Sequence, residues 1–187
     1  MSGGHGHVDS SNKNVAMLIA VLALVLAISE TLGKSAQTMG LSANIEASNL
    51  WAFFQAKTVR MTVLRTAGEQ LEAELSFADP KARDALEKRI ASWKKTSERY
   101  DTEPDTQEGR KELAARAKAA EKKRDYSLAA YHHFEIASAA VQIAIVLASA
   151  EVITGVVALV WLSGALGAVG IAFCAIGLFW PTAVHLF

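Results

Sequence analysis

The chain has 187 residues, of which 51% are hydrophobic and 20% are charged, and its formal net charge is zero. The balanced charge gives no indication of nucleic-acid binding, and the single cysteine, Cys174, excludes an intramolecular disulfide. The charge is strongly segregated: 18 of the 19 basic and 15 of the 19 acidic residues lie between Lys34 and Asp125. Long uncharged stretches on both sides of a charged centre favour a membrane protein over a soluble globular one.

The N-terminal region predicts a polar tail followed by a membrane span. Residues 1–14 are polar and rich in Gly and Ser, so we expect them to be disordered. Residues 15–32 form an apolar run of 18 residues, which is just long enough to cross a bilayer. A cleaved signal peptide is the alternative, but Lys13 is the only basic residue before the run and no convincing cleavage site follows it. An uncleaved span is favoured.

The charged segment, residues 33–133, predicts a helical, coiled-coil-like domain. Gly33 and Gly40 are expected to loosen the backbone after the first span. One long helix is then predicted over residues 41–77.

Two further helices are predicted in the charged segment. Asp79 is a suitable N-cap residue, and Pro80 is favourable in the first turn of a helix. We therefore predict a helix that starts here and ends near Tyr100. Residues 105–108 have the spacing of a capping box, so the third helix is expected to start there and to continue into the next apolar run.

The C-terminal apolar run predicts two more spans. Residues 136–180 are nearly all apolar, and a run of 45 residues is too long for one span. Thr154-Gly155 is the plausible turn, so we expect the second span at residues 134–153 and the third span with a short tail at residues 154–187. No segment has a strong strand pattern. The predicted fold class is therefore an all-α membrane protein with three transmembrane helices and a long-helix hairpin or bundle between spans one and two.

Basic residues near the span ends predict the orientation. Five of them precede the second span, namely Arg116, Lys118, Lys122, Lys123 and Arg124. The turn between spans two and three has none, and neither does the C-terminal tail. Because basic residues stay on the cytoplasmic side, the charged domain is expected to be cytoplasmic.

The long predicted helix has two apolar stripes. At 100° per residue, one stripe lies within about 40° and consists of Leu41, Ile45, Val59 and Val63. The opposite side carries larger side chains, from which we predict an interaction surface at Leu50, Trp51, Phe53, Phe54, Met61 and Leu64. The alternative is that this surface is the core of an intrachain hairpin or bundle.

The two shorter helices show weaker coiled-coil spacing. Steps of four and three residues connect Leu86, Ile90, Trp93, Ser97 and Tyr100, and likewise Leu113, Ala117, Ala120, Arg124 and Ser127. These stripes are shorter than the three to four heptads that define a coiled coil.

The predicted spans contain few polar side chains and many small ones. Gln142 lies deep in the second span and is expected to hydrogen-bond a neighbouring helix. Small residues allow helices to approach closely, so Gly164, Gly167 and Gly170 predict a tight hairpin of spans two and three.

No pattern of catalytic, metal-binding or cofactor-binding residues is present. Glu30 and Glu151 lie near span ends and are expected to reach the headgroup region. His132, His133 and Glu135 supply too few ligands for a metal site. We therefore expect a protein that is not an enzyme and that needs no cofactor.

The string from Asn44 to Lys57 (NIEASNLWAFFQAK) and the run from Val141 to Ser149 (VQIAIVLAS) resemble a bacterial membrane family described only as a domain of unknown function. The resemblance extends from about Val15 onward and implies a small three-span protein of the bacterial inner membrane. It implies no activity, ligand or catalytic residue.

Two functional hypotheses follow. The favoured one is a structural or interaction protein, either a homo-oligomer or an accessory subunit of a larger membrane complex, whose cytoplasmic helices form the contact surface. The alternative is a small channel or transporter-like protein whose spans line a path. The expected partners are the lipid bilayer and other copies of the chain or a membrane complex, not nucleic acid.

Overall fold

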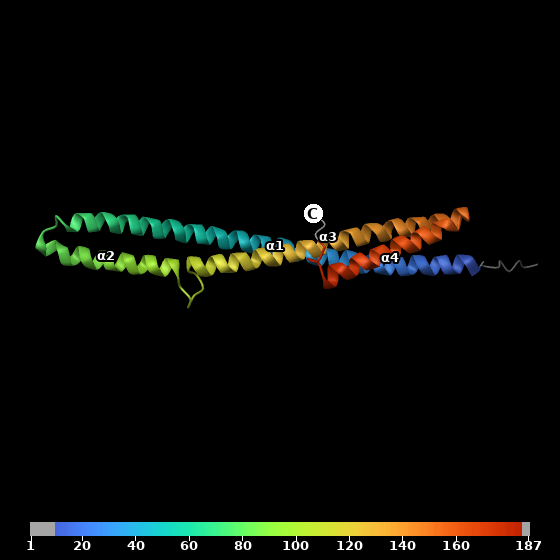
Figure 1. Ribbon diagram of the computed structural model, residues 1–187, viewed down its shortest axis with the longest axis horizontal. Coiled ribbons are helices and arrows are strands. Elements are labelled where there is room, and N and C mark those ends of the chain that lie inside the picture. The colour runs from blue at the N-terminus through green and yellow to red at the C-terminus, as the bar shows by residue number, and fades with distance from the viewer. Residues whose placement is uncertain (1–9, 185–187) are drawn as a thin grey trace, which may run out of the picture. The chain divides into compact units, whose positions relative to one another are not determined.

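Four helices make up the computed structural model, which describes residues 10–184 (Figure 1). They are α1 (Ser10–Leu75), α2 (Pro80–Asp101), α3 (Arg110–Thr154) and α4 (Ala158–Phe179), and no strand occurs among the described residues. The prediction of an all-α fold is confirmed. Three of the helices, α1, α3 and α4, are long and apolar enough to cross a membrane.

Helix α1 is continuous over 66 residues, whereas the first span and a separate helix over residues 41–77 were predicted, with the backbone loosened at Gly33 and Gly40. Both glycines lie against α3. A Cβ atom at Gly33 would lie 3.3 Å from Cβ of Phe134, and one at Gly40 would lie 3.0 Å from Cδ2 of Leu128. These glycines therefore let two helices approach closely and do not interrupt the helix.

The N-terminal boundary of α1 also differs from the predicted one. Of the tail predicted to be disordered, residues 1–9 lie outside the described part of the chain. Residues 10–14 belong to α1, which begins at Ser10.

A cap and a folded loop define the ends of α2. The side chain of Asp79 accepts a hydrogen bond from the backbone N–H of Lys81 at 2.9 Å, and Pro80 occupies the first turn, as the residue types predict. After Asp101 the chain forms a loop of residues 102–109.

Helix α3 begins at Arg110 and not at the predicted capping box of residues 105–108. Gln107 has a φ of 59°, which is outside the helical region. Gly109 lies against the backbone of Thr102 and Glu103, where no side chain would fit. The chain folds back on itself here, so a helix can form only after Gly109.

The chain divides into two compact units. One unit contains α4 together with the parts of α1 and α3 that lie up to Leu41 and from Arg124 onward. It contains two clusters of buried apolar side chains, Leu22 with Val141 and Ala144, and Ala36 with Ala130 and Phe134. We call this unit the apolar unit, because it contains all three apolar helix segments.

The other unit, Ser42–Lys123, is a helical hairpin that we call the charged unit. One arm is the C-terminal part of α1. The second arm consists of two helices in series, α2 and the N-terminal part of α3 (Figure 1). Its buried apolar cluster comprises Ala47, Leu50, Leu113, Ala117 and Ala120.

Candidate functional site

We call the side of α1 that carries the larger side chains the bulky face. In the charged unit, the bulky face lies against the other arm of the hairpin. Leu50 is buried in the apolar cluster with Leu113 and Ala117, and Trp51 and Phe54 pack against that cluster. Met61 is also buried. Most of the residues predicted to form an interaction surface thus make contacts within the chain, while Phe53 is exposed.

Polar and aromatic contacts hold this face in place. The indole Nε1 of Trp51 donates a hydrogen bond to Oε1 of Glu121 at 2.8 Å, and the rings of Trp51 and Phe54 meet edge to face at 5.4 Å. Farther along α1, Leu64 lines a cavity of about 290 Å³ together with Ile90 and Trp93 of α2. The apolar stripe of α2 therefore also faces α1.

Two cationic side chains attach the α2–α3 loop to α1, and the first is Lys57. Its side chain is only 8% exposed. Its ammonium group lies 5.4 Å from the ring centre of Phe53 and 5.1 Å from that of Tyr100, and 3.5 Å from Oε2 of Glu103. A buried ammonium group is stable only when it has such partners, so Lys57 links α1 to the end of α2 and the loop.

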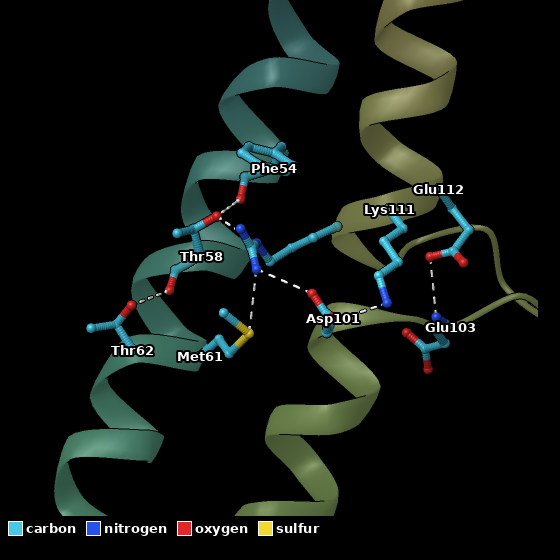
Figure 2. A network of polar contacts seen from close by, with 9 residues as sticks. Phe54, Thr58, Met61, Thr62, Asp101, Glu103, Lys111 and Glu112 are labelled. Atoms are coloured by element: carbon cyan, nitrogen blue, oxygen red, sulfur yellow. Dashed lines mark hydrogen bonds and ion pairs between the residues drawn. The ribbon is translucent and has the colours of Figure 1, made fainter.

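The second cation is Arg110, the first residue of α3. Its Nε donates to Oγ1 of Thr58 at 2.8 Å, its guanidinium group lies 4.9 Å from the ring centre of Phe54, and Met61 Sδ is 3.5 Å from Nη1. Nη1 also donates to Oδ1 of Asp101 at 3.1 Å. Figure 2 shows Phe54, Thr58 and Met61 on α1 facing Asp101 at the end of α2.

We call the contacts of Lys57 and Arg110 the clasp. Lys111 binds the second oxygen of Asp101 at 3.0 Å, and Glu112 accepts a hydrogen bond from the backbone N–H of Glu103 at 3.2 Å. These contacts join α1, α2 and α3, and each uses its charged group to hold another element. The clasp is therefore a structural site and contains no arrangement of nucleophile and base.

Sequence reasoning did not identify the clasp. Its contacts join α1 to residues much farther along the chain, since Lys57 and Glu103 are 46 positions apart and Thr58 and Arg110 are 52 apart, and its members follow no period. One signal was present, because Lys57 falls one turn before Met61 on the bulky face of α1, where a charge needs a partner.

The opposite stripe of α1 is exposed. Ile45, Val59 and Val63 are 54%, 62% and 60% exposed, and the small Ala52 on the same side is exposed too. We call these four residues the outer stripe. They form an apolar stripe on the surface of a unit that is rich in charged residues.

Small residues bring the helices of the apolar unit together. The hydroxyl of Ser163 donates to the carbonyl of Ala144 at 2.7 Å, which joins α4 to α3. A Cβ atom at Gly167 would lie 2.6 Å from Cδ2 of Leu22, and one at Gly170 would lie 2.5 Å from Cγ2 of Val141. Both glycines thus permit close contact, Gly167 with α1 and Gly170 with α3.

Gly164 does not share this role. It is exposed, and a Cβ atom there would meet no atom within 4 Å. The reason is its position one residue beyond Ser163, about 100° around the helix from the buried face. The prediction that Gly164 packs in the hairpin is corrected.

Gln142, Glu151 and His133 are polar residues of the apolar unit, and each has a different environment. Gln142 of α3 donates a hydrogen bond to Oε1 of Glu30 of α1 at 3.2 Å, so this amide does contact a neighbouring helix. Glu151, expected to reach the headgroups, is instead buried, and its Oε2 has no hydrogen-bond partner in the described structure. The buried His133 has its Nε2 3.1 Å from the carbonyl oxygen of Pro181, so that nitrogen must be the donor.

A second histidine and a tyrosine lie close to Glu135. Nδ1 of His132 is 3.6 Å from Oε2 of Glu135, and the hydroxyl of Tyr131 donates to Oε1 at 3.3 Å. The negative charge of Glu135 raises the pKa of the Tyr131 phenol above its ordinary value of 10.0. In the described part of the chain, no three His, Cys, Asp or Glu side chains come together to hold a metal ion.

Comparisons with known proteins place the chain in a family. A family model described as "Domain of unknown function (DUF4337)" matches residues 11–180. Neither the curated proteins nor the solved structures contain a match. The match extends over all four helices except the first residue of α1. The chain therefore belongs to the DUF4337 family, a family of unknown function.

Proposed function

We propose that this protein is a self-associating scaffold of the bacterial inner membrane. In this proposal α1, α3 and α4 cross the bilayer, the charged unit is cytoplasmic, and copies of the chain meet through the outer stripe of α1. The single observation that supports it is the exposure of Ile45, Val59 and Val63 in the charged unit.

Burial of the outer stripe against another molecule would be favourable. Burial of apolar surface stabilises an assembly by roughly 25 cal/mol per Å², and the intrachain partners of α1 already lie on its opposite side. The outer stripe is therefore free to contact another molecule.

A second copy of the chain fits this stripe best. Chains anchored in one membrane share their orientation and depth, so identical helices stand parallel and present the same residues at the same height. Side chains of Ile45, Ala52 and Val59 recur every seven residues, which is the spacing of one seam of a parallel coiled coil. Exposed Gln55 lies between them, and a polar residue at such a position favours one register.

The distribution of basic residues supports a cytoplasmic charged unit. Five basic residues occur between Arg116 and Arg124, directly before the apolar part of α3. The segment of residues 155–157 between α3 and α4 has none. This asymmetry is the one that orients bacterial membrane proteins.

The proposal is tested by the mass of the purified full chain in mild detergent. We expect an oligomer for the wild type and a single chain for Val59→Glu, with unchanged helical content by circular dichroism. Phe77→Glu is the matched control, because Phe77 is 92% exposed at the turn after α1 and lies outside the stripe. It should leave the oligomer intact.

Two results would overturn the proposal. One is a wild type that has the mass of one chain at micromolar concentration. The other is an oligomer that Val59→Glu and Phe77→Glu leave equally intact, since the outer stripe would then play no part in it.

A further inference from the structure

A polar groove lies within the apolar unit, between α1 and α3. It encloses about 460 Å³. Its polar lining includes Ser29, Glu30 and Lys34 of α1 and Glu135 and Gln142 of α3. Both carboxylates are exposed, with 58% of the Glu135 side chain accessible, so a ligand can reach them from outside the unit.

Both carboxylates of the groove are held in position by neighbours from α3. Gln142 donates to Oε1 of Glu30 at 3.2 Å, and Tyr131 donates to Oε1 of Glu135 at 3.3 Å. His132 lies 3.6 Å from the other oxygen of Glu135. No ion-pair contact joins Lys34 to either carboxylate among the described salt bridges.

Ser29 supplies an independent indication of a ligand. It is 0% exposed, and its hydroxyl has no hydrogen-bond partner in the described structure. Other hydroxyls of these helices are satisfied: Thr31 donates to the carbonyl of Ala27 at 2.7 Å, and Ser149 to that of Ile145 at 2.8 Å. A buried hydroxyl without a partner is rare and costly, so a polar group from outside the chain is expected near this point of the groove.

We propose that the groove binds the primary ammonium group of a phospholipid headgroup. Such a group has three N–H donors, and acceptors line both sides of the groove, Ser29 and Glu30 on α1 and Glu135 on α3. Lys34, which also lines the groove, is a partner for the phosphate of the same headgroup. A lipid is the expected source of the amine because the groove lies where the apolar runs of α1 and α3 meet their polar continuations. This inference rests on the membrane placement in the proposed function.

The test compares two lipids that differ only in the headgroup amine. The full chain is delipidated in detergent and reconstituted into nanodiscs containing equal amounts of phosphatidylethanolamine and phosphatidylcholine with identical acyl chains. After re-extraction, native mass spectrometry measures the lipid that stays bound. We expect phosphatidylethanolamine to be enriched on the wild type, because the quaternary amine of phosphatidylcholine has no N–H to donate.

Substitutions of residues that line the groove test whether the lipid binds there. Glu30→Gln combined with Glu135→Gln should abolish the enrichment, and Ser29→Ala should reduce it about tenfold, as expected for one hydrogen bond to a charged group. Glu74→Gln is the control for loss of one negative charge, since Glu74 is an exposed residue of the charged unit. It should behave as the wild type.

Three results would overturn the inference. The first is equal retention of both lipids by the wild type. The second is displacement of the lipid by free ethanolamine at an equal concentration, which would identify a soluble amine as the ligand. The third is a loss of enrichment that occurs only when the oligomer mass changes, which would make the groove a contact between copies. A wild type that is monomeric but still enriches phosphatidylethanolamine would contradict the proposed function alone.

Discussion

Arg110, the first residue of α3, donates a hydrogen bond from Nη1 to Oδ1 of Asp101, the last residue of α2, at 3.1 Å. The same guanidinium group lies over Phe54 of α1. One side chain thus joins three helices, so that α2 and the N-terminal part of α3 act as one arm of the hairpin. The charged unit depends on this residue because the loop between the helices has no apolar core of its own.

Loss of this contact should destabilise the charged unit. We expect Arg110→Ala to lower the free energy of unfolding by roughly 2–4 kcal/mol, because Asp101 and Thr58 lose a partner in a partly buried site. Thermal unfolding followed by circular dichroism measures it. Lys88→Ala is the matched control, because the Lys88–Asp84 pair is fully on the surface and should change stability by less than about 1 kcal/mol. Equal effects of the two changes would contradict the role of the clasp.

Three glycines of α4 should respond differently to the same substitution. Gly170→Leu and Gly167→Leu should each destabilise the protein by roughly 1–3 kcal/mol or prevent its folding, because the new side chain would overlap Val141 or Leu22. Gly164→Leu should lie within about 0.5 kcal/mol of the wild type, since open space surrounds it. The measurement is thermal stability in detergent. A loss of stability for Gly164→Leu as large as that for Gly170→Leu would show that the helices pack differently.

The Tyr131 phenol should titrate above the ordinary pKa of 10.0, because Glu135 is negatively charged beside it. A raised folded-state pKa favours the neutral phenol, so its contribution to stability is fully present below pH 10.0 and is lost as the pH rises through the folded-state pKa. The Glu135→Gln change should return the pKa toward the ordinary value. Ultraviolet absorbance of the phenolate measures it in a variant in which Tyr100 and Tyr126 are Phe. No change on Glu135→Gln would reject this cause.

Cysteine labelling should reveal the orientation of the chain. In a Cys174→Ala background, a cysteine at Thr154 should react in intact cells with a reagent that cannot cross the membrane, and a cysteine at Ser97 should be protected. The expectation follows from the five basic residues between Arg116 and Arg124. Rapid labelling of Ser97 from outside, before the cells are opened, would invert the proposed topology.

Both apolar stripes of α1 could be predicted from the sequence, but the sequence did not indicate which stripe packs against the other arm of the hairpin. Periodicity shows that a helix has two apolar sides and says nothing about which side another helix covers. In the structure, the small side chains of Ala117 and Ala120 on α3 leave room for the bulky Trp51 and Phe54. Burial of aromatic side chains contributes more than burial of valines, so the bulky side turns inward.

Long-range contacts account for the other differences. From the local sequence, Gly33 and Gly40 were expected to loosen the helix. Only the neighbouring side chains of Phe134 and Leu128 on α3 show why glycine is needed at these two positions. The link from Arg110 to Thr58 joins residues that are 52 positions apart, and no local pattern signals it. Helix type and apolar segments are properties of neighbouring residues and could be predicted, whereas these contacts depend on the tertiary fold.

Disulfide cross-linking of α1 to itself tests the central claim most directly. A single cysteine at Val59, in a Cys174→Ala background, is oxidised in isolated native membranes, and the products are separated on a non-reducing gel. If parallel copies meet through the outer stripe, their Val59 positions lie within roughly 7 Å of each other and a dimer forms rapidly. A cysteine at Ser92, exposed on the other arm of the hairpin, should give little product. Equal cross-linking at both positions, or none at Val59, would contradict association through α1.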